Sequence, residues 1–206
     1  MEKGLFVTFE GMEGSGKTTA IQAVAAFLTE QGHRVCITRE PGGTPIGQEI
    51  RNWLLNPDSV LQDTRSELLL FAADRLEHIA GVIRPALSRG EVVLCDRFTD
   101  STLAYQVGGR GLDSDLVAYG IGLAGLVPDL TFLMDVSPEE GLRRAGKRGA
   151  LDRFEKEDLT FHHRVRDAYL AIAKREERVH VVDTERLGPE ACVERILGVV
   201  ESSCVD

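Results

Sequence analysis

Short apolar runs alternate along this chain with longer stretches in which apolar residues recur at helical spacing. The runs are rich in β-branched and aromatic residues and end at turn residues, which is typical of strands. The five predicted strands cover residues 5–9, 34–38, 91–95, 130–136 and 178–182. Helical periodicity predicts helices over residues 18–31, 45–55, 67–89, 99–106, 113–124, 159–175 and 188–200, with another beginning at Ser137.

Strands that alternate with helices pair in parallel through right-handed crossovers. We therefore expect an α/β fold, a five-stranded parallel sheet with helices on both faces. Glu10, Thr38, Asp96 and Asp135 each end a strand, so the loops after them should share one edge of the sheet. Ligands of such folds collect at that edge. No repeat or linker divides residues 1–206, which predicts a single domain.

Composition and charge narrow the class of protein. The chain has 206 residues, 43% of them hydrophobic, and a formal charge of −9. An acidic chain of this kind is not expected to bind nucleic acid, whose partners are normally basic. No apolar stretch approaches the ~20 residues of a membrane helix, and the first residues lack a signal-peptide pattern. We expect a cytoplasmic protein with small-molecule substrates.

The cysteines and the paired histidines do not suggest a metal site. Cys36, Cys95, Cys192 and Cys204 lack paired spacing, so we expect reduced thiols, buried at the two strand positions. Neighbouring residues on a helix point in different directions. We therefore expect His162 and His163 to be surface residues.

Residues 11–18, GMEGSGKT, fit the Walker A phosphate-binding pattern, and they lie between a predicted strand and a predicted helix. The glycines allow the backbone to approach an anion, and the loop N–H groups and helix start favour phosphate. Lys17 should reach the β- and γ-phosphates, and the Thr18 hydroxyl should ligate Mg²⁺. We expect ATP and Mg²⁺ to bind there. The expected binding residues are Gly11, Met12, Glu13, Gly14, Ser15, Gly16, Lys17, Thr18 and Thr19.

Two residues at the end of the third strand add to this site. Asp96 stands where a Walker B aspartate would hold Mg²⁺ through water, opposite Thr18. Arg97 follows it, and a guanidinium can hold a phosphate bidentately, so we expect a second phosphorylated substrate. The alternatives are a plain strand-end cap for Asp96 and a salt bridge for Arg97.

A basic segment follows the fourth strand, and it stands out in an acidic chain. Glycines at 146 and 149 interrupt it, and it has few apolar anchors. A lid over about 143–154, whose arginines close on the transferring phosphoryl group, is favoured over a solvated charged face. Its basic residues are Arg143, Arg144, Lys147, Arg148 and Arg153.

The chemistry of the acceptor can also be narrowed. A hydroxyl acceptor needs a general base, whereas a phosphate monoester is mostly a dianion at pH 7 and needs positioning and charge neutralisation. No obvious base stands at the end of the third strand, and arginines are plentiful near the expected site. This pattern favours a nucleoside monophosphate as the acceptor.

The motif order then resembles a known family. The phosphate loop, TREPGG at 38–43, FAADR at 71–75, DRFTDSTLAYQ at 96–106 and the arginine-rich lid are similar to bacterial thymidylate kinases over nearly the whole chain. The resemblance implies phosphoryl transfer from MgATP to dTMP, giving dTDP. It also implies a P-loop kinase core, a mobile lid and a homodimer.

The resemblance also implies roles for residues at the acceptor phosphate and sugar. Arg39, Arg51 and Arg97 would hold or position the dTMP phosphate, and Glu40 would lie on the metal and phosphate side. Glu13 would lie by the deoxyribose 3′-hydroxyl and the phosphates.

The base site and the lid carry further implied roles. Phe71 would stack on thymine, Arg75 would hydrogen-bond its edge, and Tyr105 would occupy the space of a ribose 2′-hydroxyl. Ser101, Thr102 and Gln106 would line the base pocket. In the lid, Arg148 matches the catalytic arginine, with Arg144 and Arg153 near it at the nucleotide. Without the resemblance, Phe71 reads as core and Tyr105 and Gln106 as helix-end residues.

Asp74 departs from the family pattern, where a small or neutral residue is frequent; it could pair with Arg75 or Arg97 and alter base contacts. The nearest alternative function is a deoxynucleoside kinase, which needs a base near Asp96, where Cys95 precedes it. A regulatory GTPase would carry an Asn-Lys-x-Asp motif, and a hydrolytic ATPase would usually carry Glu at position 97. Neither feature occurs.

Overall fold

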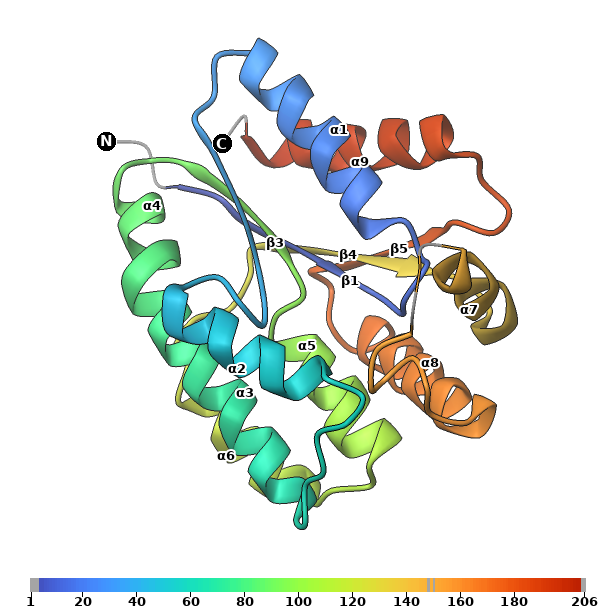
Figure 1. Ribbon diagram of the computed structural model, residues 1–206. Coiled ribbons are helices and arrows are strands. Elements are labelled where there is room, and N and C mark those ends of the chain that lie inside the picture. The colour runs from blue at the N-terminus through green and yellow to red at the C-terminus, as the bar shows by residue number, and fades with distance from the viewer. Residues whose placement is uncertain (1–3, 148, 150, 205–206) are drawn as a thin grey trace.

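The computed structural model describes residues 4–147, 149 and 151–204 (Figure 1). Within them, the strands are β1 (Phe6–Glu10), β2 (Val35–Arg39), β3 (Val92–Asp96), β4 (Leu130–Asp135) and β5 (Val179–Asp183). The α-helices are α1 (Lys17–Glu30), α2 (Pro45–Leu55), α3 (Thr64–His78), α4 (Arg84–Ser88), α5 (Thr99–Thr102), α6 (Ser114–Gly122), α7 (Pro138–Gly146), α8 (Leu159–Ala173) and α9 (Pro189–Cys204). Two π-helical segments, η1 (Ile79–Ile83) and η2 (Leu103–Gly109), continue α3 and α5.

The five strands form one parallel sheet in the order β2-β3-β1-β4-β5. Helices α1 and α9 cover one face, and helices α3, α5 and α8 lie on the other (Figure 1). The predicted α/β fold is confirmed. Because β1 is central and every strand runs the same way, the loops after β1, β3 and β4 meet at the sheet's carboxyl edge.

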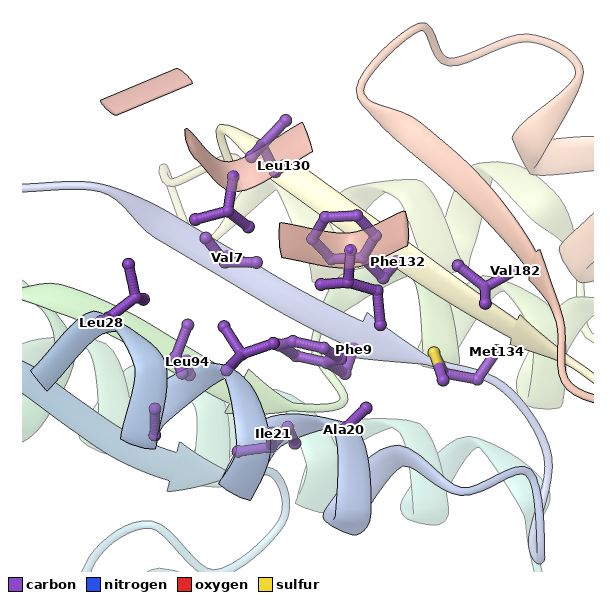
Figure 2. Packing of buried hydrophobic residues seen from close by; sticks show 14 of the residues in the cluster. Val7, Phe9, Ala20, Ile21, Leu28, Leu94, Leu130, Phe132, Met134 and Val182 are labelled. Carbon is purple, nitrogen blue, oxygen red and sulfur yellow. The ribbon is translucent and has the colours of Figure 1, made fainter. Parts of the chain in front are cut away.

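Alternation along the buried strands supplies a separate core for each face of the sheet. Val7 and Phe9 of β1 pack with α1, α9, Phe132 and Met134, as Figure 2 shows for this cluster. Phe6, one position away, packs on the opposite face with residues of η1 and α4. A third cluster, which includes Tyr105, lies under α8. The strands were recognisable because both faces of the sheet are buried.

The long helix expected over residues 67–89 begins earlier and changes geometry before its end. Asp63 caps α3, its side chain accepting from the Arg65 N–H, so the helix begins at Thr64. The π-helical turn η1 precedes Pro85, the residue expected to kink the helix. A proline lacks the N–H that an α-helix needs there. The wider π-helical turns of η1, just before Pro85, are consistent with the loss of this N–H donor.

Ser137 precedes α7 in the N-cap position, as expected, although its side chain makes no capping bond. Two smaller predictions were wrong. His162 is fully buried rather than exposed, because α8 is covered on more than one side, whereas His163 is exposed and contacts Glu139. Cys36 is only half-buried, because β2 is an edge strand. Among the described residues, no helix is long and apolar enough to cross a membrane.

Candidate active site

The phosphate loop connects β1 to α1 at the carboxyl edge of the sheet. Gly11 and Gly14 have φ values of 128° and 70°, in the region that favours glycine. A Cβ on Gly14 would lie 2.1 Å from the carbonyl oxygen of Gly141, on α7. The loop therefore requires glycine there, both for its own conformation and for its close approach to α7.

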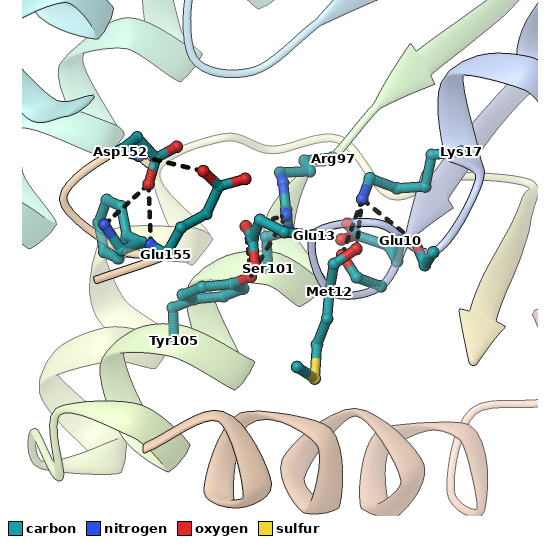
Figure 3. Close-up of polar contacts among 12 residues, drawn as sticks. Glu10, Met12, Glu13, Lys17, Arg97, Ser101, Tyr105, Asp152 and Glu155 are labelled. Carbon is teal, nitrogen blue, oxygen red and sulfur yellow. Dashed lines mark hydrogen bonds and ion pairs between the residues drawn. The ribbon is translucent and has the colours of Figure 1, made fainter. Parts of the chain in front are cut away.

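Lys17, the first residue of α1, extends into the loop (Figure 3). Its Nζ donates to the carbonyl oxygens of Gly11 and Met12, at 3.0 and 2.9 Å. Burial, reinforced by the nearby Arg97, lowers the pKa of Lys17 to about 8. Through these contacts its amino group lies within the phosphate loop, where a positive charge would favour phosphate.

Asp96 ends β3 and lines the same cavity as Lys17 and Thr18. Its Oδ1 is buried and has no hydrogen-bond partner among the described residues. A buried carboxylate oxygen without a partner is costly unless a cation or water meets it. A carboxylate and a hydroxyl are also the hard oxygen ligands that Mg²⁺ prefers. Asp96 and Thr18 therefore fit the expected Mg²⁺ site.

Arg97 lies at the centre of a polar cluster (Figure 3). Its φ of 71° is rare for a residue with a side chain. Its Nη2 donates to Glu13 Oε1 at 2.6 Å and to the Tyr105 hydroxyl, and its Nη1 to Ser101 and Tyr169. The backbone conformation and four side chains thus fix the guanidinium.

Glu13 receives donors from two sides. Besides Arg97, the Tyr105 hydroxyl reaches both carboxylate oxygens at 2.8 Å. Burial acts to raise the pKa of Glu13, but Arg97 and Lys17 outweigh it and leave that pKa below its ordinary value. The alternative considered for Arg97, a salt bridge, is therefore present, and it joins the phosphate loop to the residue after β3.

Glu10, the last residue of β1, lies beneath this cluster. Its Oε1 accepts from the Phe98 N–H, and its Oε2 accepts from the hydroxyls of Ser101 and Tyr169. Burial, together with Asp100, raises the pKa of Glu10 to about 7. The carboxylate organises the residues that hold Arg97 without lining the cavity itself.

One cavity of about 470 Å³ joins the phosphate loop to a second pocket. In that pocket, Arg75 donates to Glu40 Oε2 at 2.8 Å and to Thr102 at 2.9 Å. Glu40 is buried, and His78 contacts its other oxygen. Of the expected acceptor-site residues, the structure brings together at this cavity Glu13, Arg39, Glu40, Arg51, Phe71, Arg75, Arg97, Ser101, Thr102, Tyr105 and Gln106.

Asp74 does not pair with Arg75 or Arg97. It is fully buried, and its Oδ1 accepts from the Gly42 N–H at 3.0 Å. Burial raises its pKa to about 6. Arg75 turns away from it toward Glu40 because the two side chains leave α3 in different directions. Asp74 therefore holds the loop that follows Arg39, the last residue of β2, and does not contact the base pocket.

The expected lid is only partly at the cavity. Arg144 lies on α7, contacts Glu140 and the Thr184 carbonyl, and lines the cavity at the phosphate loop. Arg153 does not line it; its guanidinium donates to Glu67 and to the Leu54 carbonyl. The buried carboxylate of Glu67 holds Arg153 away from the cavity, and its expected role at the nucleotide stays a prediction. Arg148 lies outside the described residues.

The lid also has an apolar anchor that the sequence analysis missed. Phe154 is buried and packs against Phe71 and Tyr105, with ring centroids 6.1 and 5.6 Å apart. The segment after the basic run thus forms part of the acceptor pocket wall, together with Asp152 and Glu155. Figure 3 shows Asp152 and Glu155 at the upper left, above Tyr105.

A second hollow of about 350 Å³ lies on the other side of the phosphate loop. It is bounded by Ser15, Gly16 and Arg144, and by residues after β5 such as Thr184 and Leu187. The segment after β5 gives no signal of this hollow in the sequence, because it lacks the charged and glycine-rich pattern of the phosphate loop. The hollow shares Gly14, Gly16, Thr19 and Arg144 with the larger cavity.

Comparison with known proteins agrees with this geometry. The family model described as thymidylate kinase matches residues 9–196. The chain belongs to the thymidylate kinase family. The thymidylate kinase of Solidesulfovibrio magneticus is 48% identical over 95% of this chain and 98% of its own length. That of Geotalea uraniireducens is 51% identical, over 87% of this chain and 89% of its own.

A solved structure gives the same result for the fold. The thymidylate kinase of Ehrlichia chaffeensis is 37% identical to this chain and superposes with a TM-score of 0.79. The match covers 97% of this chain and 99% of that one. The family and the sheet topology are therefore both established.

The sequence did not predict the contacts of several residues at or near the site. Tyr169 reaches Arg97 from 72 residues away, and Glu67 reaches Arg153 from 86 residues away. Both belong to amphipathic helices, where a polar residue near the apolar face carries no local signal of its partner. Glu10 had a weak signal, because a charged residue at the end of a wholly buried strand needs partners.

Proposed function

We propose that this protein transfers the γ-phosphoryl group of ATP to dTMP, giving ADP and dTDP. The observation that carries the proposal is the shared cavity, which is lined both by the phosphate loop and by Phe71, Arg75 and Arg97. Two phosphorylated substrates can thus meet in one cavity. The named activity of the relatives supports the choice of acceptor.

Residues of the phosphate loop would hold the donor. The loop N–H groups and Lys17 would bind the β- and γ-phosphates, and the second hollow after β5 would receive the adenosine part. Thr18 and Asp96 would hold Mg²⁺. There Mg²⁺ would supply positive charge that offsets the charge of the phosphates.

Arginines would position the acceptor. Arg97 is fixed by four side chains, and Arg39 and Arg51 line the same cavity, so together they can neutralise a monophosphate dianion. Glu13 would receive the sugar 3′-hydroxyl, while Phe71 and Arg75 would bind the base. Because the acceptor is already ionised near pH 7, positioning and charge neutralisation suffice, and no general base is required.

We further propose that residues of about 143–154 act as a lid within one kinase domain. Arg144 already lies at the phosphate loop, and Arg148 is proposed to stabilise the charge on the transferring group. Phe154 would couple lid closure to the acceptor pocket, since it packs on Phe71.

A cytoplasmic homodimer is proposed as the working form. Large apolar side chains remain exposed on α2, α3 and α6, with Leu69 65% and Tyr119 71% exposed. A second copy of this chain would cover them, as in an apolar protein interface. The other exposed apolar residues on these helices are Ile46, Trp53, Leu76 and Leu116.

The test of the function is ADP production from MgATP with dTMP, thymidine, UMP or no acceptor. We expect fast turnover with dTMP and little with the other three. Turnover with thymidine alone would indicate a nucleoside kinase. ADP release without an acceptor would indicate hydrolysis, and either result would overturn the proposal.

A further inference from the structure

Glu67 lies in the first turn of α3 and is 1% exposed. Its Oε1 accepts from Gln106 Nε2 at 2.8 Å, and its Oε2 accepts from Arg153 Nη2 at 2.7 Å. Arg110 makes longer contacts, of 3.4 and 3.5 Å, with the two oxygens. The buried Glu67 carboxylate thus accepts hydrogen bonds from Gln106 in η2, from Arg110, which follows η2, and from Arg153 in the lid.

This contact decides which way the Gln106 amide points. A carboxylate that binds two arginines offers only acceptors, so the NH₂ group of Gln106 must face Glu67. The carbonyl oxygen is the other branch of the same amide. Gln106 is 1% exposed and lines the acceptor pocket, so that oxygen is the branch left for a bound base.

Gln106 and Arg75 then present different groups within the same pocket. Arg75 offers only N–H donors, and Gln106 so oriented offers an acceptor. Thymine carries a carbonyl at C4 beside an N–H at N3, which complements a donor next to an acceptor. Cytosine carries the reverse, an amino group at C4 beside an unprotonated N3.

We propose that Glu67 is a specificity-determining positioning residue, which fixes the Gln106 amide so that the pocket accepts the N3–H of thymine and rejects cytosine. The proposal rests on the proposed function, since it concerns the same acceptor. Glu67 does not line the cavity, so it acts on the bound base through Gln106, which does.

The variant Glu67→Gln tests the orientation directly. Arg153 requires an acceptor, so the carbonyl of the new glutamine should face Arg153 and its NH₂ group should face Gln106. The Gln106 amide would then turn over and present its NH₂ group to the base. That donor opposes the N3–H of thymine and fits the N3 of cytosine.

The measurement is kcat/KM for dTMP and for dCMP in both proteins. In Glu67→Gln the ratio of dTMP to dCMP should fall at least about tenfold, the effect of one hydrogen bond. The value for dTMP should fall while that for dCMP rises. The matched control is Arg153→Gln, which breaks the same ion pair but keeps the carboxylate opposite Gln106. Its ratio should equal that of the wild type.

A change of dTMP and dCMP by the same factor in Glu67→Gln would overturn the inference and leave the proposed function standing. A wild type without dTMP turnover would overturn both. If Glu67→Gln does not fold, Gln106→Met removes the carbonyl at similar size and should also lower the ratio about tenfold. An unchanged ratio there would likewise overturn the inference.

Discussion

Arg97 is the residue on which the acceptor site is centred, and the sequence indicated it because it follows a strand-ending aspartate. What the sequence did not contain is how the side chain is fixed. Its positive φ and its bonds to Glu13, Ser101 and Tyr169 arise from three separate parts of the chain. Such fixed charge lowers the cost of organising a site during reaction.

The variant Arg97→Lys tests this organisation. A lysine keeps the charge but cannot reach Glu13, Ser101 and Tyr169 at once or bind a phosphate bidentately. We expect kcat/KM for dTMP to fall about 100-fold, the effect of losing one or two charge-assisted bonds. Arg186→Lys is the control, since that side chain is 88% exposed. A change below about twofold in Arg97→Lys would contradict this role.

The raised pKa of Glu10 implies that the stability of the fold depends on pH. Its pKa is about 7 in the folded protein, raised from an ordinary value of 4.5 by burial and by Asp100. The folded state therefore binds more protons than the unfolded state between these values. The free energy of unfolding should accordingly fall as pH rises from about 4.5 to about 7.

Replacing this group with Glu10→Gln should remove that dependence. Chemical denaturation from pH 5 to 8 should show the variant gaining in stability relative to the wild type up to about pH 7, then levelling off. Glu30→Gln, on the exposed end of α1, should stay parallel to the wild type. Parallel curves for Glu10→Gln as well would contradict the buried, protonated carboxyl.

At the scale of elements, the sequence predicted those features that depend only on the residues of the element itself. The phosphate loop, the strand ends and the proline at position 85 all act through their own backbone, so their sequence positions suffice. The lid could not be predicted in the same way. Phe154 and Arg153 are held by Phe71 and Glu67, contacts that exist only once α3 and the lid have packed together.

The proposed role of the lid can be tested by kinetics. If Arg148 contacts the phosphoryl group mainly in the transition state, Arg148→Ala should lower kcat by at least about 100-fold and raise the KM for dTMP far less. Arg143→Ala is the control, because Arg143 is exposed and pairs with Glu140. Turnover equal to that of the wild type would remove Arg148 from the mechanism.

At the scale of the molecule, alternating apolar runs predicted the parallel sheet and placed the site at its carboxyl edge. The order of the strands and the long-range pairs did not follow from the same pattern. Tyr169 meets Glu10 across 159 residues, a contact set by which helix packs on which face. Such pairs depend on the whole packing arrangement and leave no spacing signature in the sequence.

The exposed apolar faces of α2, α3 and α6 predict the state of assembly. The wild type should sediment as a dimer, and Leu69→Glu combined with Tyr119→Glu should sediment as a monomer, because two charges would be buried without partners. Val127→Glu is the control, an exposed apolar residue outside these helices. A monomeric wild type, or a double variant that stays dimeric, would contradict this interface.

The central claim is transfer of a phosphoryl group between two nucleotides in one cavity. The most direct measurement follows label from the γ-phosphate of ATP in the presence of Mg²⁺ and dTMP. We predict that the label appears in dTDP, one equivalent for each ADP formed. Label recovered as inorganic phosphate, with dTMP unchanged, would contradict the account.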